Sequence, residues 1–312
     1  MGIFKAYDVR GIHPSEIDEP FAERFGAAVA AFLKAKRLAV GRDVRLSAPA
    51  IARAVAKGAS AAGAEVIDIG LSTTPMLYFA VGKMELDGGI MVTASHNPPE
   101  WIGFKVCRER AYPIGEATGL KEIQALLGHA PPSPGGRIIA RPVVREYREH
   151  LRRFVKRVPN LKVVVDAANG AVGAHFDAIF GDLGLDWVRL CFPPDGRFPN
   201  HEPNPLKDEN VRDAMSKVRE VKADLAACFD GDGDRCVFLG PGGERIPSEL
   251  VTVLLARSEL RRSPGAAIVC DLRSSRVVPE EIVKAGGRPI RERVGHAFIK
   301  ATMKSNDAAL GG

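Results

Sequence analysis

The chain has 312 residues, and its 44 Lys and Arg against 38 Asp and Glu give a formal net charge of +6. Hydrophobic residues make up 46% and charged residues 26%, which excludes a disordered or collagen-like chain and is typical of a globular protein. At roughly 100–200 residues per domain this length predicts two or three domains, and no apolar run approaches the roughly 18 residues of a membrane span.

A short apolar strand that ends in an Asp recurs three times, over residues 38–43, 162–166 and 267–271. A loop of small residues and a helical pattern follow each strand, with the helices expected over 49–62, 174–183 and 278–284. A second strand then begins after Gly63, Gly184 and Gly286. The order strand, loop, helix, strand predicts parallel βαβ units.

The strand-ending residues Asp43, Asp166 and Asp271 lie 123 and 105 residues apart, which are domain-sized intervals. We therefore predict an α/β fold of tandem related domains with mixed, mostly parallel sheets. Domain I is placed at 1–140, domain II at 141–243 and a partial domain III at 244–312.

Three stretches connect the predicted elements between and within these repeats. The Pro/Gly-rich segment 130–137 is predicted as the loop that closes the first unit. The segment 144–158 is expected to be a helix leading into the second unit, and 194–205, which has no regular period, a long loop within it. If the units are alike, the last strand of the third unit is expected at 307–312, where the sequence ends. We therefore expect the third domain to be incomplete and the chain to be a partial protein.

The two least ordinary loops follow matching strands of the first two units. The strand 89–93 runs into Ala94-Ser95-His96-Asn97-Pro98, and the strand 224–229 runs into Asp230-Gly-Asp-Gly-Asp-Arg235. Ligands gather at the carboxyl ends of strands in open parallel sheets, so these loops are expected to form a binding site.

The second loop has the composition of a magnesium site. Asp230, Asp232 and Asp234 alternate with glycines that let the backbone curl, and three carboxylates this close repel unless a cation neutralises them. Hard oxygen ligands suit Mg²⁺. An EF-hand is excluded because its sixth and twelfth positions would be Arg235 and Pro241. The alternative is a solvated acidic turn.

Ser95 places a hydroxyl on a predicted turn. Taken alone, it is explained equally well by an ordinary Ser/Thr turn and by a nucleophilic serine. Its neighbour His96 is a candidate catalytic residue, although adjacent side chains often diverge. A metal loop at the matching strand end favours the functional interpretation, because a metal and a serine that can carry a phosphoryl group are the minimum for phosphoryl transfer.

These two loops, together with Lys5-Ala-Tyr-Asp-Val-Arg-Gly11 and Gly41-Arg-Asp-Val-Arg45, resemble the α-D-phosphohexomutase family, in its phosphomannomutase/phosphoglucomutase branch. The resemblance covers the whole chain in order. It implies four domains, the first three of one α/β type around a central cleft, and the fourth domain is expected to be absent here. It also implies that Ser95 is a phosphoserine and that its phosphate and the three Asp residues hold Mg²⁺.

Further roles follow from the resemblance. Tyr7 and Arg10 match a motif facing the cleft, and Arg235 is expected to contact a phosphate. In the third domain Arg273 matches a basic position, and Val294-Gly295-His296 matches a Thr-Gly-His stretch that contacts the sugar.

Lys105, in Gly103-Phe-Lys105, is a candidate for proton transfer, and the sequence does not choose between it and His296. Two positions depart from the family pattern. Ile102 stands where an Asn is usual, which puts local loop contacts in doubt, and Val294 stands for a Thr.

The implied activity is reversible phosphoryl transfer between the 1- and 6-positions of mannose or glucose phosphate, through phosphoserine and a bisphosphorylated sugar. Hexose 1,6-bisphosphate would be intermediate and activator. The alternatives are a phosphoglucosamine mutase, or a truncated chain with only phosphatase or sugar-phosphate-binding activity. The expected partner is a hexose phosphate, with no nucleic acid and no membrane, and the chain is expected to be a monomer or weak homodimer.

The five cysteines are scattered, odd in number and form no C-x-x-C pair. This pattern argues against a disulfide framework and against a zinc site, and it favours a cytoplasmic location.

Overall fold

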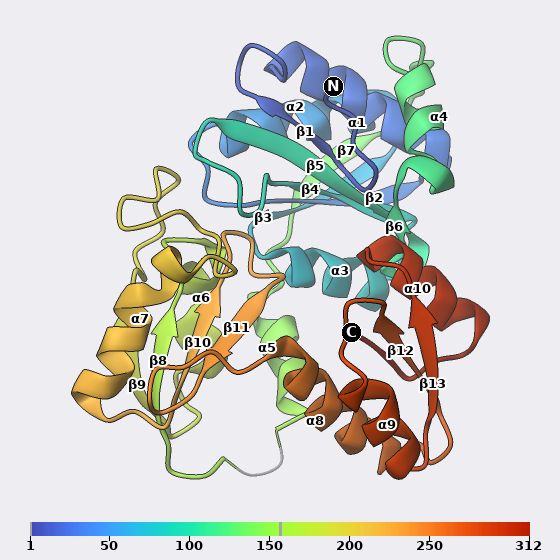
Figure 1. Ribbon diagram of the computed structural model, residues 1–312. Helices are drawn as coiled ribbons and strands as arrows, with labels where there is room; N and C mark the ends of the chain where they lie inside the picture. The colour runs from blue at the N-terminus through green and yellow to red at the C-terminus, as the bar shows by residue number, and fades with distance from the viewer. Residues whose placement is uncertain (1, 156–157) are drawn as a thin grey trace. The chain divides into compact units, whose positions relative to one another are not determined.

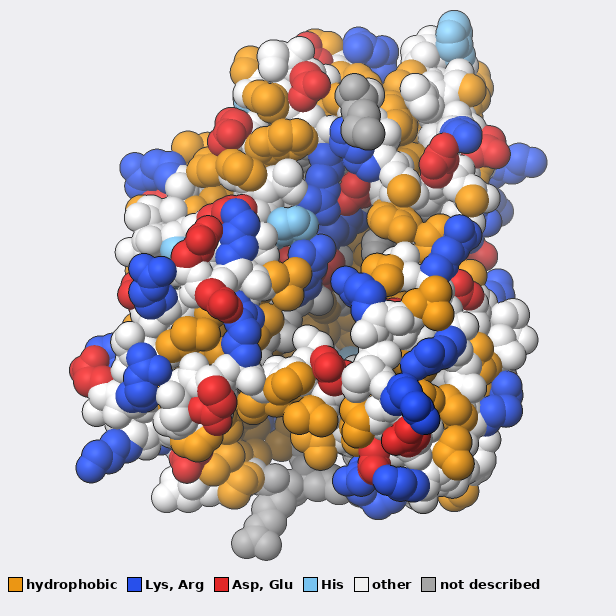
Figure 2. Space-filling view, viewed as in Figure 1, with side chains coloured by type: hydrophobic (Ala, Val, Ile, Leu, Met, Phe, Trp, Pro, Cys, Tyr) orange, Lys and Arg blue, Asp and Glu red, His pale blue; other side chains and the backbone are white. Residues whose placement is uncertain are grey.

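The computed structural model describes residues 2–155 and 158–312, except for the side chains of residues 296 and 297 (Figure 1). It divides into two compact units, Met1–Glu244 and Arg245–Gly312. None of the helices in the described ranges is both long and apolar enough to cross a bilayer. On the face seen in Figure 2, Lys and Arg side chains are interspersed with Asp and Glu.

The first sheet of unit one has the strand order β1-β5-β4-β2-β3-β7, with β6 paired to β5. Pairs among β2, β3, β4 and β7 are parallel, whereas β5 pairs antiparallel with β4, β1 and β6. The strands are β1 (Val9–Ile12), β2 (Arg37–Arg42), β3 (Glu65–Leu71), β4 (Gly88–Val92), β5 (Trp101–Arg108), β6 (Pro113–Ile114) and β7 (Arg137–Ala140).

Helices cover both faces of this sheet and enclose two apolar cores. The larger core lies under α1 (Glu19–Leu33), α2 (Ala48–Ala61) and α4 (Leu120–Ala125), and the smaller under α3 (Thr74–Lys83). Two short 3₁₀ helices, Glu109–Ala111 and Glu116–Thr118, lie between β5 and α4. The helices α1 and α2 approach closely at Gly26 and Gly58. A Cβ on Gly26 would lie 2.1 Å from the Val55 carbonyl oxygen, so only glycine permits this packing.

The second sheet has the order β11-β10-β8-β9 and repeats the arrangement β5-β4-β2-β3 of the first. The central strands are parallel, and the outer β11 is antiparallel to β10, as β5 is to β4. Its strands are β8 (Lys162–Asp166), β9 (Asp186–Leu190), β10 (Leu225–Phe229) and β11 (Cys236–Leu239), with helices α5 (Val144–Arg152), α6 (Ala171–Phe180) and α7 (Asp208–Val221).

The unit Arg245–Gly312 contains the third repeat, with strand order β13-β12-β14. Its elements are α8 (Ser248–Leu260), β12 (Ala267–Asp271), α9 (Val277–Lys284), β13 (Arg288–Glu292), α10 (His296–Ser305) and β14 (Leu310–Gly311). The strand predicted at 307–312 is confirmed, because Leu310 pairs in parallel with Ile268. All three sheets are therefore mixed or parallel α/β sheets of one design, as predicted.

The Asp that ends each repeat's first strand has the same local role. Its Oδ1 accepts the backbone N–H two residues later, at 3.0 Å in Asp43, 2.9 Å in Asp166 and 2.8 Å in Asp271. The side chain thereby turns the chain away from the sheet edge. This shared turn explains why the same sequence pattern recurs at each strand end.

Some predicted boundaries are wrong. The helix predicted over 144–158 ends at Arg152, with a turn at 153–154, and residues 156–157 lie outside the described part. Phe154 beyond it is 56% exposed, so little apolar burial supports a longer helix. The helix predicted over 174–183 begins at Ala171, whose N–H donates to Gly231 O, and ends before Gly181. The loop predicted over 130–137 is present up to Gly136, and the edge strand β7 begins at Arg137.

Candidate functional site

Ser95 lies in a tight loop at the carboxyl end of β4. Its φ of 52° is in the left-handed region, and the residue is fully buried. The Ser95 N–H donates to Thr93 Oγ1 at 2.8 Å, and the Thr93 hydroxyl donates to Asp43 Oδ2 at 2.7 Å. The strand-ending Asp of the first repeat therefore fixes the loop that presents Ser95.

Arg45 holds the same loop through its backbone. The side chain is fully buried, and its Nε donates to Asp43 Oδ2 at 3.2 Å. Its guanidinium also donates to four carbonyl oxygens at 2.5–3.0 Å, those of Ser95, Asn97, Pro98 and Trp101. A planar fork with several donors can satisfy this many acceptors at once, which an ammonium cannot.

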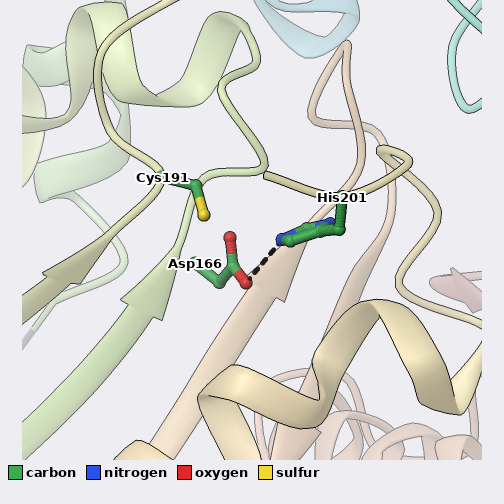
Figure 3. Close-up of side chains that lie close together, drawn as sticks. All are labelled: Asp166, Cys191 and His201. Carbon is green, nitrogen blue, oxygen red and sulfur yellow. Dashed lines mark hydrogen bonds and ion pairs between the residues drawn. The ribbon is translucent and has the colours of Figure 1, made fainter. Parts of the chain in front are cut away.

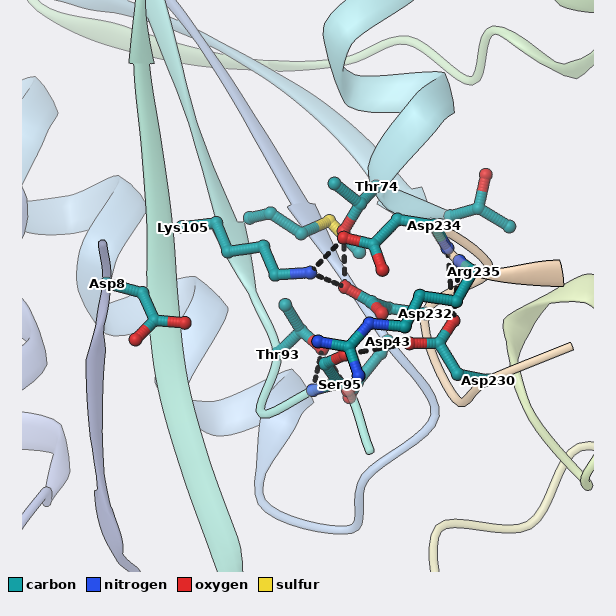
Figure 4. A network of polar contacts seen from close by, with 12 residues as sticks. Asp8, Asp43, Thr74, Thr93, Ser95, Lys105, Asp230, Asp232, Asp234 and Arg235 are labelled. Carbon is teal, nitrogen blue, oxygen red and sulfur yellow. Dashed lines mark hydrogen bonds and ion pairs between the residues drawn. The ribbon is translucent and has the colours of Figure 1, made fainter. Parts of the chain in front are cut away.

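The loop of Asp residues after β10 meets Ser95 directly (Figure 4). Ser95 Oγ donates to Asp230 Oδ2 at 2.8 Å, and Asp230 Oδ1 accepts the N–H groups of Asp234 and Arg235 at 3.1 and 3.2 Å. Between them Gly231 is required, since a Cβ there would lie 2.7 Å from the Ser95 carbonyl oxygen. The two loops predicted to form one site do lie together.

Lys105 and Thr74 complete the contacts of the Asp loop. Lys105, on β5, donates to Asp232 Oδ2 at 2.6 Å and to Asp234 Oδ2 at 2.5 Å. Thr74, at the start of α3, donates its hydroxyl to Asp232 Oδ2 at 2.5 Å and its N–H to the Asp232 carbonyl at 2.9 Å. Both side-chain hydrogen bonds to Asp232 fall on Oδ2, and its buried Oδ1 has no hydrogen-bond partner among the residues that the structure describes.

The buried charges shift one another's pKa values. Burial, together with the neighbouring carboxylates of Asp232 and Asp234, raises the pKa of Asp230 well above its usual value. Burial also disfavours the charged form of Asp232, but Lys105 outweighs it and lowers that pKa. Burial would lower the pKa of Lys105, and the three carboxylates raise it instead. Three carboxylates therefore share the ammonium of Lys105, and their mutual repulsion, added to burial, disfavours the negative charge of Asp230.

This arrangement fits a divalent cation with oxygen ligands. Asp230, Asp232 and Asp234 each offer one carboxylate oxygen, and the three atoms lie within 4.8 Å of one another. The orphaned Oδ1 of Asp232 is the group that a cation would satisfy. Three hard oxygen donors match Mg²⁺ better than a softer metal.

His96 and Arg235 lie beside Ser95. His96 Nδ1 is 3.4 Å from Ser95 Oγ. Burial, followed by the charges of Arg235 and Arg10, lowers the pKa of His96 to about 4. His96 is therefore neutral at pH 7. Arg235 extends from the Asp loop toward Ser95 in Figure 4.

Arg10, at the end of the N-terminal motif, braces the serine loop. It donates to the Ala94 carbonyl at 3.3 Å and to Asn97 Oδ1, and it pairs with Asp8 at 2.8 Å. Tyr7 lies just before β1 and is half-buried.

The candidate residues of the third repeat belong to the unit Arg245–Gly312. Arg273 folds onto Asp271, with Nη2 and Nε at 2.6 and 3.0 Å from Oδ2. Gly295, with φ of 134°, precedes α10, and the His296 side chain lies outside the described part. The role of these residues beside Ser95 stays a prediction.

Three residues of the site were assigned no role from the sequence, namely Arg45, Thr74 and Thr93. Arg45 was visible only as part of the Gly41–Arg45 motif. Thr74 stands in Ser-Thr-Thr-Pro, a pattern that signals a helix start, but its contact with Asp232 joins residues 158 positions apart.

Comparison with known proteins agrees with this geometry. Models of phosphoglucomutase/phosphomannomutase α/β/α domains I, II and III match residues 1–130, 145–243 and 247–312. The chain is 42% identical to phosphohexose mutases of Xanthomonas campestris pv. campestris and 41% identical to a phosphomannomutase of Escherichia coli K12. Each alignment covers 99% of this chain and 70% of the relative.

Solved structures give the same result. A phosphoglucomutase/phosphomannomutase family protein from Burkholderia thailandensis is 34% identical, with a TM-score of 0.94 over 99% of this chain and 70% of that chain. A putative phosphomannomutase from Thermus thermophilus, at 24% identity and a TM-score of 0.87 over 99% of this chain and 73% of that one, shares the fold. The chain therefore belongs to the α-D-phosphohexomutase family, and it is an enzyme of the phosphotransferase/mutase class.

Proposed function

We propose that the protein interconverts the 1- and 6-phosphates of a hexose, with Ser95 as the residue that carries the phosphoryl group. The observation that supports this most is the contact of Ser95 Oγ with Asp230 Oδ2 at 2.8 Å, inside a cluster of three convergent carboxylates. A serine hydroxyl beside three convergent carboxylates can carry a phosphoryl group whose charge a cation held by those carboxylates would offset.

Asp230, Asp232 and Asp234 would hold Mg²⁺ together with a phosphate on Ser95. The bound ion would offset the charge of the phosphoryl group and polarise it. In transfer to the sugar, the bond from Ser95 Oγ to phosphorus breaks as a sugar oxygen bonds to phosphorus. The sugar hydroxyl loses its proton and Ser95 Oγ gains one, so the serine ends as a free hydroxyl that can take a phosphoryl group in the return transfer. The resulting hexose 1,6-bisphosphate is the intermediate, and added bisphosphate would act as an activator.

Lys105 suits the role of a charged donor in this site. Its ammonium reaches Asp232 and Asp234 beside Ser95, so it would donate a hydrogen bond to the phosphoryl group or a proton to the Ser95 oxygen. Arg235 would pair with a phosphate, since its guanidinium matches phosphate oxygens in geometry. His96, neutral with a pKa of about 4, would act as a hydrogen-bonding partner of Ser95 and not as a strong base.

The substrate that we propose is mannose or glucose phosphate, because relatives at 41–42% identity are named phosphomannomutase and phosphohexose mutases. A phosphoglucosamine substrate is the alternative. We place the protein in the cytoplasm, because all five cysteines are free thiols in the described part of the chain.

An isomerase assay with Ser95→Ala tests the proposal. The wild-type protein with Mg²⁺ is expected to convert mannose 1-phosphate or glucose 1-phosphate to the 6-phosphate, and the variant to show no conversion. Inorganic phosphate is measured in the same samples, because release without isomer formation would identify a phosphatase. Unchanged isomerase turnover in Ser95→Ala would remove Ser95 from the role, and glucosamine phosphates assayed in parallel decide the sugar.

A further inference from the structure

Unit one contains a second cluster of metal-ligand side chains, formed by Asp166, Cys191 and His201 (Figure 3). One ligand atom of each, a carboxylate oxygen, the thiol sulfur and a ring nitrogen, lies within 4.8 Å of the others. Asp166 ends β8, Cys191 follows β9, and His201 comes from the long loop over 194–205. The sequence argued against a zinc site because its cysteines are scattered and form no C-x-x-C pair, and the spacings of 25 and 10 residues match no zinc motif either.

The ring of His201 is oriented as in a metal ligand. Its Nδ1 lies 2.9 Å from the carbonyl oxygen of Glu202, and its Nε2 lies 3.0 Å from Asp166 Oδ2. Without an ion, Nδ1–H donates to that carbonyl and Nε2–H donates to the Asp166 carboxylate; a metal ion would displace the Nε2 proton and take its lone pair, with Nδ1–H still held by Glu202. Metal-ligating histidines usually have their second ring nitrogen held in this way. In a tetrahedral site with bonds of about 2.0 Å, nitrogen and oxygen ligands are about 3.3 Å apart, close to the separation found here.

The backbone around these ligands is fixed before any ion binds. Asp166 is 1% exposed, and its Oδ1 accepts the Ala168 N–H at 2.9 Å, which leaves Oδ2 for the cluster. Cys191 has a φ of 51°, and its carbonyl accepts the Asn169 N–H at 2.7 Å. The Asn169 side chain also bonds the Pro193 carbonyl and Asn200, each at 2.8 Å. Three ligands on a bonded framework lose little entropy on binding a metal.

We propose that Asp166, Cys191 and His201 bind a zinc-class transition metal ion, with water in a fourth position. A thiolate, an imidazole and a carboxylate together select Zn²⁺ over Mg²⁺, whereas the Asp230–Asp234 loop offers only oxygen. The two proposed sites therefore differ in ligand chemistry and share no ligand residue, so each can be tested without the other.

The ion would anchor a loop that reaches the serine loop. Gly196 packs against the backbone of Val44 and Arg45, where a Cβ would lie 2.4 Å from the Val44 carbonyl oxygen. The Phe198 ring lies under the Arg45 guanidinium, 5.2 Å from Cζ to the ring centroid. Tying His201 to Asp166 and Cys191 fixes the chain on both sides of this contact, and Arg45 in turn holds the carbonyl of Ser95.

Cobalt is a probe that separates the two sites. The whole protein, stripped of metal with a chelator under reducing conditions, is titrated with Co²⁺ and its absorption spectrum recorded. Co²⁺ bound by Cys191 is expected to give a thiolate charge-transfer band that saturates at one ion per chain and is displaced by Zn²⁺. An oxygen-only site cannot give that band.

Variants assign the band to its ligands. Cys191→Ser and His201→Gln are expected to lose it, whereas Cys236→Ser, at an exposed cysteine of the same sheet, keeps it. The double variant Asp230→Asn/Asp232→Asn also keeps it, so the result is independent of the proposed phosphoryl transfer. Circular dichroism shows whether each variant is folded. If a variant does not fold, a crystal of the wild-type protein soaked in Zn²⁺ provides the second test, with anomalous density expected between Asp166, Cys191 and His201. Absence of the band in folded wild-type protein, or an equal band in folded Cys191→Ser, would leave an imidazolium–carboxylate pair only and overturn the proposal.

Discussion

At the scale of single residues, the balance of charge in the Asp230–Asp234 loop depends on Lys105. Its ammonium bonds two of the three carboxylates and is 10% exposed, so solvent replaces little of its interaction with the buried Asp232. A cation that binds the same carboxylates would neutralise part of the charge that Lys105 now offsets.

Replacing Lys105 by Met should therefore cost stability in a way that Mg²⁺ reduces. Removing one partner of a buried pair costs about 3–5 kcal/mol, and we expect a loss of that size in urea unfolding without divalent ions. Saturating MgCl₂ should restore more stability to Lys105→Met than it adds to wild type. Lys57→Met, at an exposed ion pair, is the control and should change little. A loss in Lys105→Met that is the same with and without Mg²⁺ would contradict a shared cation site.

Arg45 gives a second prediction at this scale. Its side chain is fully buried with Asp43, and Arg45→Met removes the cation beside that carboxylate and one donor from each of four loop carbonyls. We expect a loss of about 3–5 kcal/mol in thermal or urea unfolding. Arg53→Met, at an exposed position of α2, is the matched control. A change in Arg45→Met as small as in the control would show that the serine loop is held by other contacts.

The residues that the sequence could identify are those whose type and local order already specify chemistry. The alternation of Asp and Gly in 230–234 and the turn at Ser95 are of this kind. Arg45, Thr74 and the Asp166–Cys191–His201 cluster could not be found, because their meaning arises only where distant segments meet. Burial and pairing, which make Arg45 different from any surface arginine, have no local signature.

At the scale of elements, the alternation of side chains along β5 explains how Ile102 is accommodated. Ile102 and Phe104 are fully buried in the larger core of the first sheet, while Lys105 points to the Asp loop from the opposite face. The departure from Asn therefore falls on the core side of the strand and leaves the polar side intact.

Restoring the family residue at this position should destabilise the protein. Ile102→Asn places an amide in an apolar core and removes packed methyl groups, so we expect a loss of about 3 kcal/mol in urea unfolding. Ile102→Val should cost about 1 kcal/mol. Equal stability of Ile102→Asn and wild type would contradict the placement of residue 102 in an apolar core without hydrogen-bond partners for an amide.

Element types could be predicted from the sequence more reliably than their ends. The βαβ repeats follow from apolar runs and Gly positions, which act locally. The end of α5 depends on whether Phe154 finds something to pack against, and the start of α6 on the carbonyl of Gly231, which is 60 residues away from Ala171. The antiparallel strands β5 and β11 carry no βαβ signal and were not predicted.

At the scale of the whole molecule, unit one is a duplication in which the second repeat is bonded to the first. Thr74 bonds Asp232, and His175 on α6 bonds the carbonyl of Leu71 at 2.8 Å. These contacts lie at the carboxyl ends of the strands, so the same interactions that join the repeats also bring Asp230 to Ser95.

His175 makes this junction sensitive to acid. Burial lowers its pKa below the ordinary 6.5, although its bond to Leu71 opposes the shift. The unfolded chain therefore binds the proton more readily, and the contribution of His175 to stability is present above pH 6.5 and is lost as pH falls below it. Between pH 7.5 and 5.5 wild type should lose more unfolding free energy than His175→Gln. Equal losses in wild type and His175→Gln would contradict this. The control is His129→Gln, at an exposed site, which should lose as much unfolding free energy as wild type.

The central claim is that Ser95 gives its phosphoryl group to the sugar and takes it back. The most direct test follows the Ser95 peptide by mass spectrometry after the protein has been incubated with glucose 1,6-bisphosphate and Mg²⁺. We expect one phosphoryl group on Ser95, which leaves on addition of a hexose monophosphate and is found in hexose bisphosphate within a single turnover. Isomerase turnover with Ser95 unmodified throughout, or a label that passes only to water, would contradict it.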